Sequence, residues 1–173
     1  MKKLFVFLLI FIAVKAAKAQ YRNDKESKMI FLSAGPEIGA PSNTPYNLSY
    51  GGSATAEAKV MNQLGLTITA GYTNYKYKSS IFGASNIETH PTFVPLKAGV
   101  KFYTSPSFYV GGELGSTIQS NNNIGSLFVY SLGFGFEIPV NPLSDIEVGF
   151  RYENYSKTQY QTTALRVAYR IGW

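Results

Sequence analysis

Residues 146–153 read IEVGFRYE, and every second side chain in this stretch is large and apolar. The residues of that parity are Ile146, Val148, Phe150 and Tyr152, whereas the other parity holds a glycine and three charged residues. Successive side chains of a β-strand point to opposite faces, while an amphipathic helix repeats its apolar residues every three to four positions. The stretch therefore predicts a strand with one apolar face and one charged face.

The same alternation recurs along most of the chain, and no segment shows helical spacing over a helical length. It predicts eight strands, at about 28–40, 47–60, 64–77, 92–103, 108–119, 126–138, 146–155 and 162–173. Asn, Gly, Pro and Ser supply turn chemistry in the breaks between them. These breaks lie at 41–46, 61–63, 78–91, 104–107, 120–125, 139–145 and 156–161.

The composition narrows the class of protein. The chain has 173 residues, of which 45% are hydrophobic, 15% aromatic and 15% charged. Soluble domains are usually about one quarter charged, so the charged fraction is low, and the apolar content argues against disorder. The chain has no cysteine, which excludes disulfides, zinc–thiolate sites and cysteine nucleophiles.

The N-terminus has the layout of a secretory signal peptide. Lys2 and Lys3 precede the apolar run 4–14, and the triplet Ala-Lys-Ala at 17–19 follows. The run is too short for a transmembrane helix, which needs about 20 apolar residues. We therefore expect a signal peptide at 1–19, a polar lead-in at 20–27 and a single β-barrel at 28–173.

The leader also carries much of the positive charge. Four of the 16 basic residues lie in it, so the formal charge of +6 overstates that of the mature chain. No basic stripe remains on the predicted strands, and we expect no nucleic-acid partner.

The charged residues of the predicted strands lie on one face, opposite the large apolar residues. They are Glu37, Glu57, Lys59, Lys97, Lys101, Glu113, Glu137, Glu147, Arg151, Glu153, Arg166 and Arg170. Twelve of the 16 glycines share this face. Long charged side chains fit inside a narrow eight-stranded barrel only beside very small neighbours. Enclosed charges are also tolerated only when they are paired, and six of these twelve are acidic and six basic.

The interleaved charges and glycines favour a polar interior and a lipid-facing apolar surface. The predicted fold is thus all-β, an eight-stranded antiparallel up-and-down transmembrane β-barrel with a structural charge network in its lumen. The aromatic residues of the apolar face gather toward the strand ends, as in the girdles of membrane barrels. Residues 75–78, YKYK, are interpreted as part of this belt, with lysines that extend to the interface.

With these features the chain resembles the small eight-stranded outer-membrane β-barrels of Gram-negative bacteria, typified by OmpX and the OmpA membrane domain. The leader, the eight runs and the tail 165–173, LRVAYRIGW, carry the resemblance. It implies that Tyr169 and Trp173 form an assembly signal read by the barrel-insertion machinery, and that outer-membrane lipid surrounds the barrel. It also implies periplasmic termini and outward loops at 41–46, 78–91, 120–125 and 156–161.

The sequence offers little chemistry. The single histidine, His90, lies near Ser79, Ser80 and Ser85, residue types that some lipid-modifying outer-membrane enzymes use. No motif brings a nucleophile, a base and an orienting group together, and one histidine does not build the usual multi-histidine zinc site. We expect no catalytic residue, no cofactor and no metal.

The favoured function is a non-enzymatic outer-membrane barrel with a filled polar lumen and a structural or interaction role, its protein partner left open. Three alternatives stay open. The first is a narrow, porin-like pore for ions or small solutes, and the second a lipid-modifying enzyme that uses His90. The third is a soluble, lipocalin-like carrier, although the only tryptophan, Trp173, is not near the first strand, where such carriers have one.

Removal of Trp173 is expected to slow insertion into the outer membrane, because the resemblance assigns this residue to the assembly signal. Outer-membrane yield and heat-modifiable gel mobility measure the effect. Unaltered yield and mobility would argue against that role.

Overall fold

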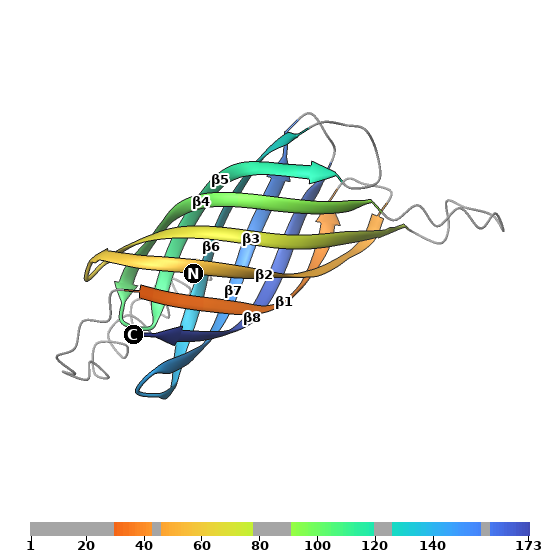
Figure 1. Ribbon diagram of the computed structural model, residues 1–173. Coiled ribbons are helices and arrows are strands. Elements are labelled where there is room, and N and C mark those ends of the chain that lie inside the picture. The colour runs from red at the N-terminus through yellow and green to blue at the C-terminus, as the bar shows by residue number, and fades with distance from the viewer. Residues whose placement is uncertain (1–29, 43–45, 78–90, 120–125, 157–159) are drawn as a thin grey trace, which may run out of the picture.

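The computed structural model describes residues 30–42, 46–77, 91–119, 126–156 and 160–173, which form a closed antiparallel β-barrel (Figure 1). Its strands are β1 (Ile30–Ser42), β2 (Tyr46–Met61), β3 (Leu64–Tyr77), β4 (Thr92–Ser105), β5 (Phe108–Gln119), β6 (Leu127–Asn141), β7 (Ser144–Tyr155) and β8 (Gln161–Gly172). Each strand pairs with its neighbours in sequence, and β8 pairs with β1 to close the barrel. The predicted eight-stranded up-and-down barrel is confirmed.

The strands end within a few residues of their predicted bounds, with one larger difference. β6 continues to Asn141 and β7 begins at Ser144, so the predicted break 139–145 is too long. Its prolines suggested a loop, but the barrel rim tolerates Pro139, which pairs with Asp145 at the end of the ladder. The side-chain oxygen of Asn141 accepts a hydrogen bond from the backbone N–H of Leu143 at 2.9 Å, which stabilises the tight turn.

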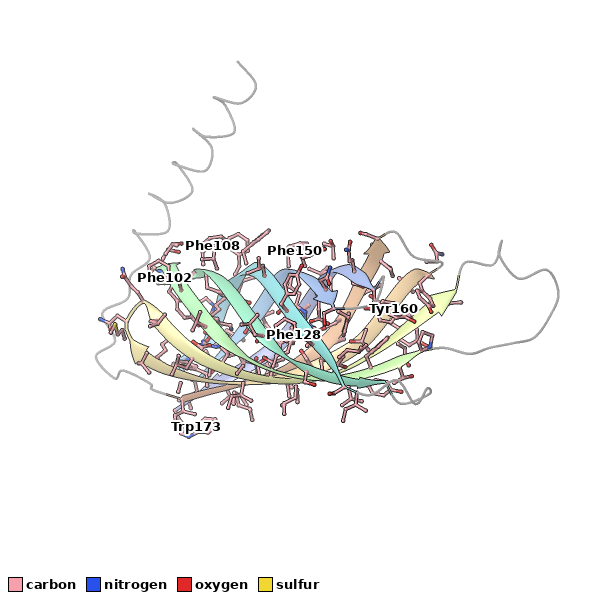
Figure 2. All side chains as sticks on the ribbon, turned by 90° about the horizontal axis from the view of Figure 1, so that it is seen from above. Phe102, Phe108, Phe128, Phe150, Tyr160 and Trp173 are labelled. Carbon is pink, nitrogen blue, oxygen red and sulfur yellow. The ribbon has the colours of Figure 1, made fainter. Side chains whose placement is uncertain are left out.

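The apolar face of every strand points outward. Leu114 and Leu132, in the middle of the wall, are 60% and 62% exposed. Figure 2 shows side chains such as Phe102, Phe150 and Trp173 projecting from the outside of the barrel. This surface is unsuited to water and suited to lipid, so the soluble carrier is excluded. No helix within the described ranges is long and apolar enough to cross a membrane.

The two ends of the barrel differ in their connections. Tight turns join β2 to β3, β4 to β5 and β6 to β7 at one end, which we call the turn end, and the start of β1 and the end of β8 lie there as well. The opposite end, the loop end, carries the longer connections. The predicted signal peptide, lead-in and residues 78–90 with His90 lie outside the described residues.

Leu114→Arg is expected to lower the free energy of unfolding by about 2–4 kcal/mol, because it places a charge on the lipid face near the middle of the membrane. Val140→Arg is the matched control: Val140 is also exposed, but it lies at the turn end, where the cost falls to about 0–1 kcal/mol. Urea titration of the refolded protein in lipid vesicles measures both. Equal costs would contradict the assigned membrane depth.

Candidate functional site: the barrel interior

The predicted lumen residues all lie on the inner face, where most of them meet in ion pairs. We call these twelve residues, with Asp145, the ion-pair network. At the turn end, Arg170 is only 2% exposed and contacts three carboxylates, those of Glu57, Glu137 and Asp145, at 3.3, 3.1 and 2.8 Å. Its guanidinium also lies 3.5 Å from the ring centroid of Phe31. A single cation is thus paired with carboxylates from three strands, β2, β6 and β7.

Lys101 and two tyrosines complete the turn-end layer. The Lys101 ammonium lies 3.0 Å from Glu147 and 3.4 Å from Glu57. The Tyr103 hydroxyl donates to Glu57, and the Tyr109 hydroxyl donates to Glu147 at 2.7 Å. These hydroxyls provide charge-assisted hydrogen bonds to buried carboxylates, which reduce the cost of enclosing them.

Arg166 links the turn-end layer to the middle of the lumen. It is paired with Glu147 at 2.9 Å and with Glu37 at 3.4 Å. Its Nε also donates to the Ser53 hydroxyl at 2.9 Å, and one terminal nitrogen donates to the Ser33 hydroxyl at 3.1 Å. The guanidinium is therefore held by four side chains from strands on both sides of β8.

The pairs nearest the loop end are centred on Glu153. This carboxylate accepts a hydrogen bond from the Lys97 ammonium and lies 3.4 Å from Arg151. Arg151 in turn contacts Glu37 at 2.6 Å, and Lys97 contacts Glu113 at 3.3 Å. The ion pairs therefore form a chain that runs from the turn end past the middle of the barrel.

Lys59 lies over two aromatic rings. Its ammonium lies 4.9 Å from the ring centroid of Phe31 and 4.2 Å from that of Tyr103. These cation–π contacts place it over the aromatic side of the turn-end layer.

Glycines on the inner face leave room for large side chains. A Cβ on Gly135 would lie 2.5 Å from the Tyr109 hydroxyl oxygen, and one on Gly65 would lie 2.5 Å from a carboxylate oxygen of Glu57. Gly135 also pairs with Gly149, which lies beside the same tyrosine. Without these glycines the tyrosine and glutamate could not occupy their positions.

The loop end of the lumen holds an aromatic cluster, which we define as Tyr46, Tyr75, Phe93, Tyr155 and Tyr160. Its buried members pack with Leu127 and Val129. Phe93 lies at the centre, with ring centroids 4.9 Å from Tyr155 and from Tyr160 and 5.5 Å from Tyr75. The Tyr75, Phe93 and Tyr155 side chains are fully buried. The cluster adds an apolar layer at the loop-end side of the ion pairs.

The sequence interpretation of residues 75–78 is wrong for Tyr75. This residue shares the inward parity of Thr67 and Thr69, and its hydroxyl hydrogen-bonds to that of Thr162 at 2.9 Å inside the barrel. Lys76, of the opposite parity, is exposed. The side chains of Tyr77 and Lys78 lie outside the described residues. The alternation itself identifies Tyr75 as an inner residue, because Tyr75 has the parity of the inward residues of its strand. The same rule identifies Phe93 and Tyr155 as inner residues.

Sequence reasoning also missed Asp145 and Tyr103. Asp145 was placed in a loop, but as a β7 residue it points toward Arg170. Tyr103 lies on the inward row of β4 with Lys97 and Lys101, so the same parity rule identifies it.

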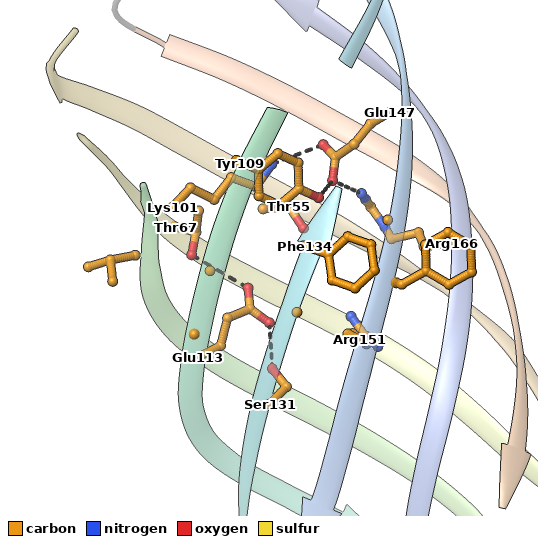
Figure 3. A pocket seen from close by; sticks show the side chains of 16 residues that line it. Thr55, Thr67, Lys101, Tyr109, Glu113, Ser131, Phe134, Glu147, Arg151 and Arg166 are labelled. Atoms are coloured by element: carbon orange, nitrogen blue, oxygen red, sulfur yellow. Dashed lines mark hydrogen bonds and ion pairs between the residues drawn. The ribbon is translucent and has the colours of Figure 1, made fainter. Parts of the chain in front are cut away.

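A cavity of about 60 Å³ lies near the middle of the lumen (Figure 3). Its lining includes the charged or hydroxyl-bearing residues Thr55, Thr67, Lys101, Tyr109, Glu113, Ser131, Glu147, Arg151 and Arg166, together with four glycines and with Val100, Phe134 and Phe150. Figure 3 shows Tyr109, Lys101 and Arg166 converging on Glu147, while Thr67 and Ser131 contact Glu113. One water needs about 10–15 Å³ of such volume, so the cavity accommodates a few waters and no larger solute. Within the described ranges, no group of three or more His, Cys, Asp or Glu is arranged to hold a metal ion.

Comparison with solved structures finds small membrane barrels. Neisserial surface protein A (NspA) matches with a TM-score of 0.62 and 18% identity, over 83% of this chain and 97% of that one. Ail, the attachment invasion locus protein of Yersinia pestis, matches with a TM-score of 0.57 and 16% identity, over 84% and 100%. The outer membrane protein AlkL matches with a TM-score of 0.58 and 10% identity, over 89% and 95%.

The chain has the fold of the small eight-stranded outer-membrane barrels. No protein-family model and no curated protein sequence matches it. The outward apolar wall agrees with the fold, because such a barrel is stable only where lipid covers its surface. The protein is therefore an integral protein of the outer membrane.

Glu153→Gln is expected to cost about 3–5 kcal/mol of folding free energy, because it leaves Lys97 and Arg151 enclosed with one fewer counter-charge. The variant Lys97→Gln/Glu153→Gln restores the balance and is expected to lose less than the two single variants added together. Urea titration in vesicles measures this double-mutant cycle. Additive losses would show that the two side chains do not interact.

Proposed function

We propose that this protein is a non-catalytic outer-membrane barrel with a filled lumen, whose role is structural or consists of presenting its outward loops to a partner. The observation that carries the proposal is the occupied interior. Paired charges extend from the turn end past the middle, and the aromatic cluster occupies the loop end. The cavity within the ion-pair network is too small for a solute.

The filled interior directs the interaction role to the outside of the barrel. Because the lumen offers no room for a ligand, a partner has to be recognised at the rims, on the wall or by the loops. Among the solved structures of similar fold, Ail is named for attachment and invasion and has a structure in complex with the heparin analogue sucrose octasulfate. That example supports an interaction role for a barrel of this fold and identifies no ligand for this chain.

A narrow pore is the second candidate, because the cavity is lined by charged groups of both signs. Rearrangement of these pairs could connect it to either end. Its small volume and the fully buried rings at the loop end favour the closed form. A lipid-modifying enzyme rests on His90 alone, which lies outside the described residues.

The purified protein is expected to leave the conductance of a planar lipid bilayer at background, because paired charges and the buried aromatic cluster occupy its interior. Single-channel recording at rising voltage, with protein-free vesicle fusion as the control, provides the measurement. Reproducible conductance steps in the wild-type protein would favour the pore.

Deletion of the gene is expected to leave the acylation and headgroups of the outer-membrane lipid unchanged, because a structural or interaction barrel transforms no lipid. Mass spectrometry of extracted lipid A compares the deletion strain with its parent. A modification that disappears with the gene and returns on complementation would identify an enzyme instead.

A further inference from the structure

Two layers of different chemistry fill the lumen in series. The ion-pair network extends from the turn end to Glu153, and the aromatic cluster lies beyond it at the loop end. Tyr75 and Tyr155 stand in the last three residues of their strands, and Phe93 is the second residue of β4. The two layers therefore meet at Glu153, whose carboxylate accepts a hydrogen bond from the Tyr155 hydroxyl. Either layer could in principle block passage through the barrel.

The network contains space of the size of water molecules. The central cavity of about 60 Å³ is lined by Arg151, and so is a second gap of about 10 Å³ that reaches Tyr75 and Thr162. The buried Nε of Arg151 has no hydrogen-bond partner among the described residues, which suits a donor that faces hydrated space. Space of the size of water molecules thus lies beside Arg151 both in the middle of the lumen and near Tyr75 of the aromatic cluster.

The aromatic cluster is closely packed. Three of its five rings are fully buried, and the centroids of neighbouring rings in the cluster lie 4.9–5.5 Å apart. The Tyr46 and Tyr160 hydroxyls bond to each other at 3.0 Å, and the Tyr75 hydroxyl bonds to Thr162. The ring carbons thus pack against one another while these hydroxyls have partners inside the barrel, and apolar constrictions block ions by excluding water.

The two layers also respond differently to water. A water molecule can replace a direct contact within an ion pair at little enthalpic cost, so paired charges alone admit water and small ions slowly. Water between two packed rings loses hydrogen bonds and gains none. The aromatic cluster therefore resists hydration more strongly than the ion-pair network does.

We propose that the aromatic cluster is the permeability barrier of this barrel, and that the ion-pair network beneath it is a hydrated vestibule. This inference rests on the proposed closed lumen and specifies where it is closed. It assigns Phe93 and Tyr155 a sealing role, and it leaves the charged residues with a role in stability.

The test is Phe93→Ala/Tyr155→Ala, which removes the two central rings. Its conductance in planar bilayers is expected to rise about tenfold or more above that of the wild type, because the apolar constriction is lost. The matched control is Phe128→Ala/Tyr72→Ala, which also removes one phenylalanine and one tyrosine ring, but from the outer wall. Heat-modifiable gel mobility establishes that each variant is folded.

A second measurement uses the absence of native cysteine. Ser131→Cys places one thiol on the wall of the central cavity. Silver ion, a charged thiol reagent small enough for this cavity, is added outside intact cells and is expected to modify the thiol slowly in the wild-type background. Tyr160→Ala, a milder change at the half-buried edge of the cluster, is expected to raise that rate about tenfold.

The outcomes separate the two proposals. Conductance in the wild-type protein overturns the filled lumen itself. A silent wild type with silent, folded cluster variants overturns only the sealing role. So does a silent wild type in which Lys97→Gln/Glu153→Gln conducts, because the barrier would then be the ion-pair network.

Discussion

A charged side chain enclosed in a narrow eight-stranded barrel must be paired with an opposite charge inside the same barrel. Arg170 and Lys97 are almost completely removed from solvent, and each contacts carboxylates from at least two other strands. A slip of one residue in any strand would turn its charges toward lipid and its apolar side chains inward. The ion pairs therefore specify the register of the whole barrel, and the apolar wall follows from the same alternation.

This constraint explains how much could be predicted from the sequence. Parity alone assigned each strand residue to the wall or the lumen, because lipid and enclosed charge impose opposite demands on the two faces. Parity does not say which acid meets which base. Arg166 contacts Glu37 across the β8–β1 seam, and Arg151 contacts the same carboxylate from β7. Such pairings depend on strand tilt and side-chain length, which no local pattern contains.

The errors have local physical causes. Pro139 and Pro142 are turn residues in most contexts, so Asp145 was assigned to a loop. At the barrel rim a proline loses no ladder hydrogen bond, and the strand continues past it. Tyr75 was assigned to the membrane belt because tyrosines near strand ends are common there. The same residue type serves both faces, however, and only its phase relative to Thr69 distinguishes an outer tyrosine from an inner one.

The fold leaves the protein's specificity to a small part of the chain. Solved barrels of this fold share 10–18% identity with it, which is enough to preserve a wall and a closed ladder but conveys no common chemistry. Wall residues are constrained by lipid, and inner residues are constrained by charge pairing and by the packing around Phe93. A substitution of a wall residue or an inner residue that improved contact with a partner would lower the stability of the folded barrel. Changes that serve a partner therefore cost least at positions that belong to neither set.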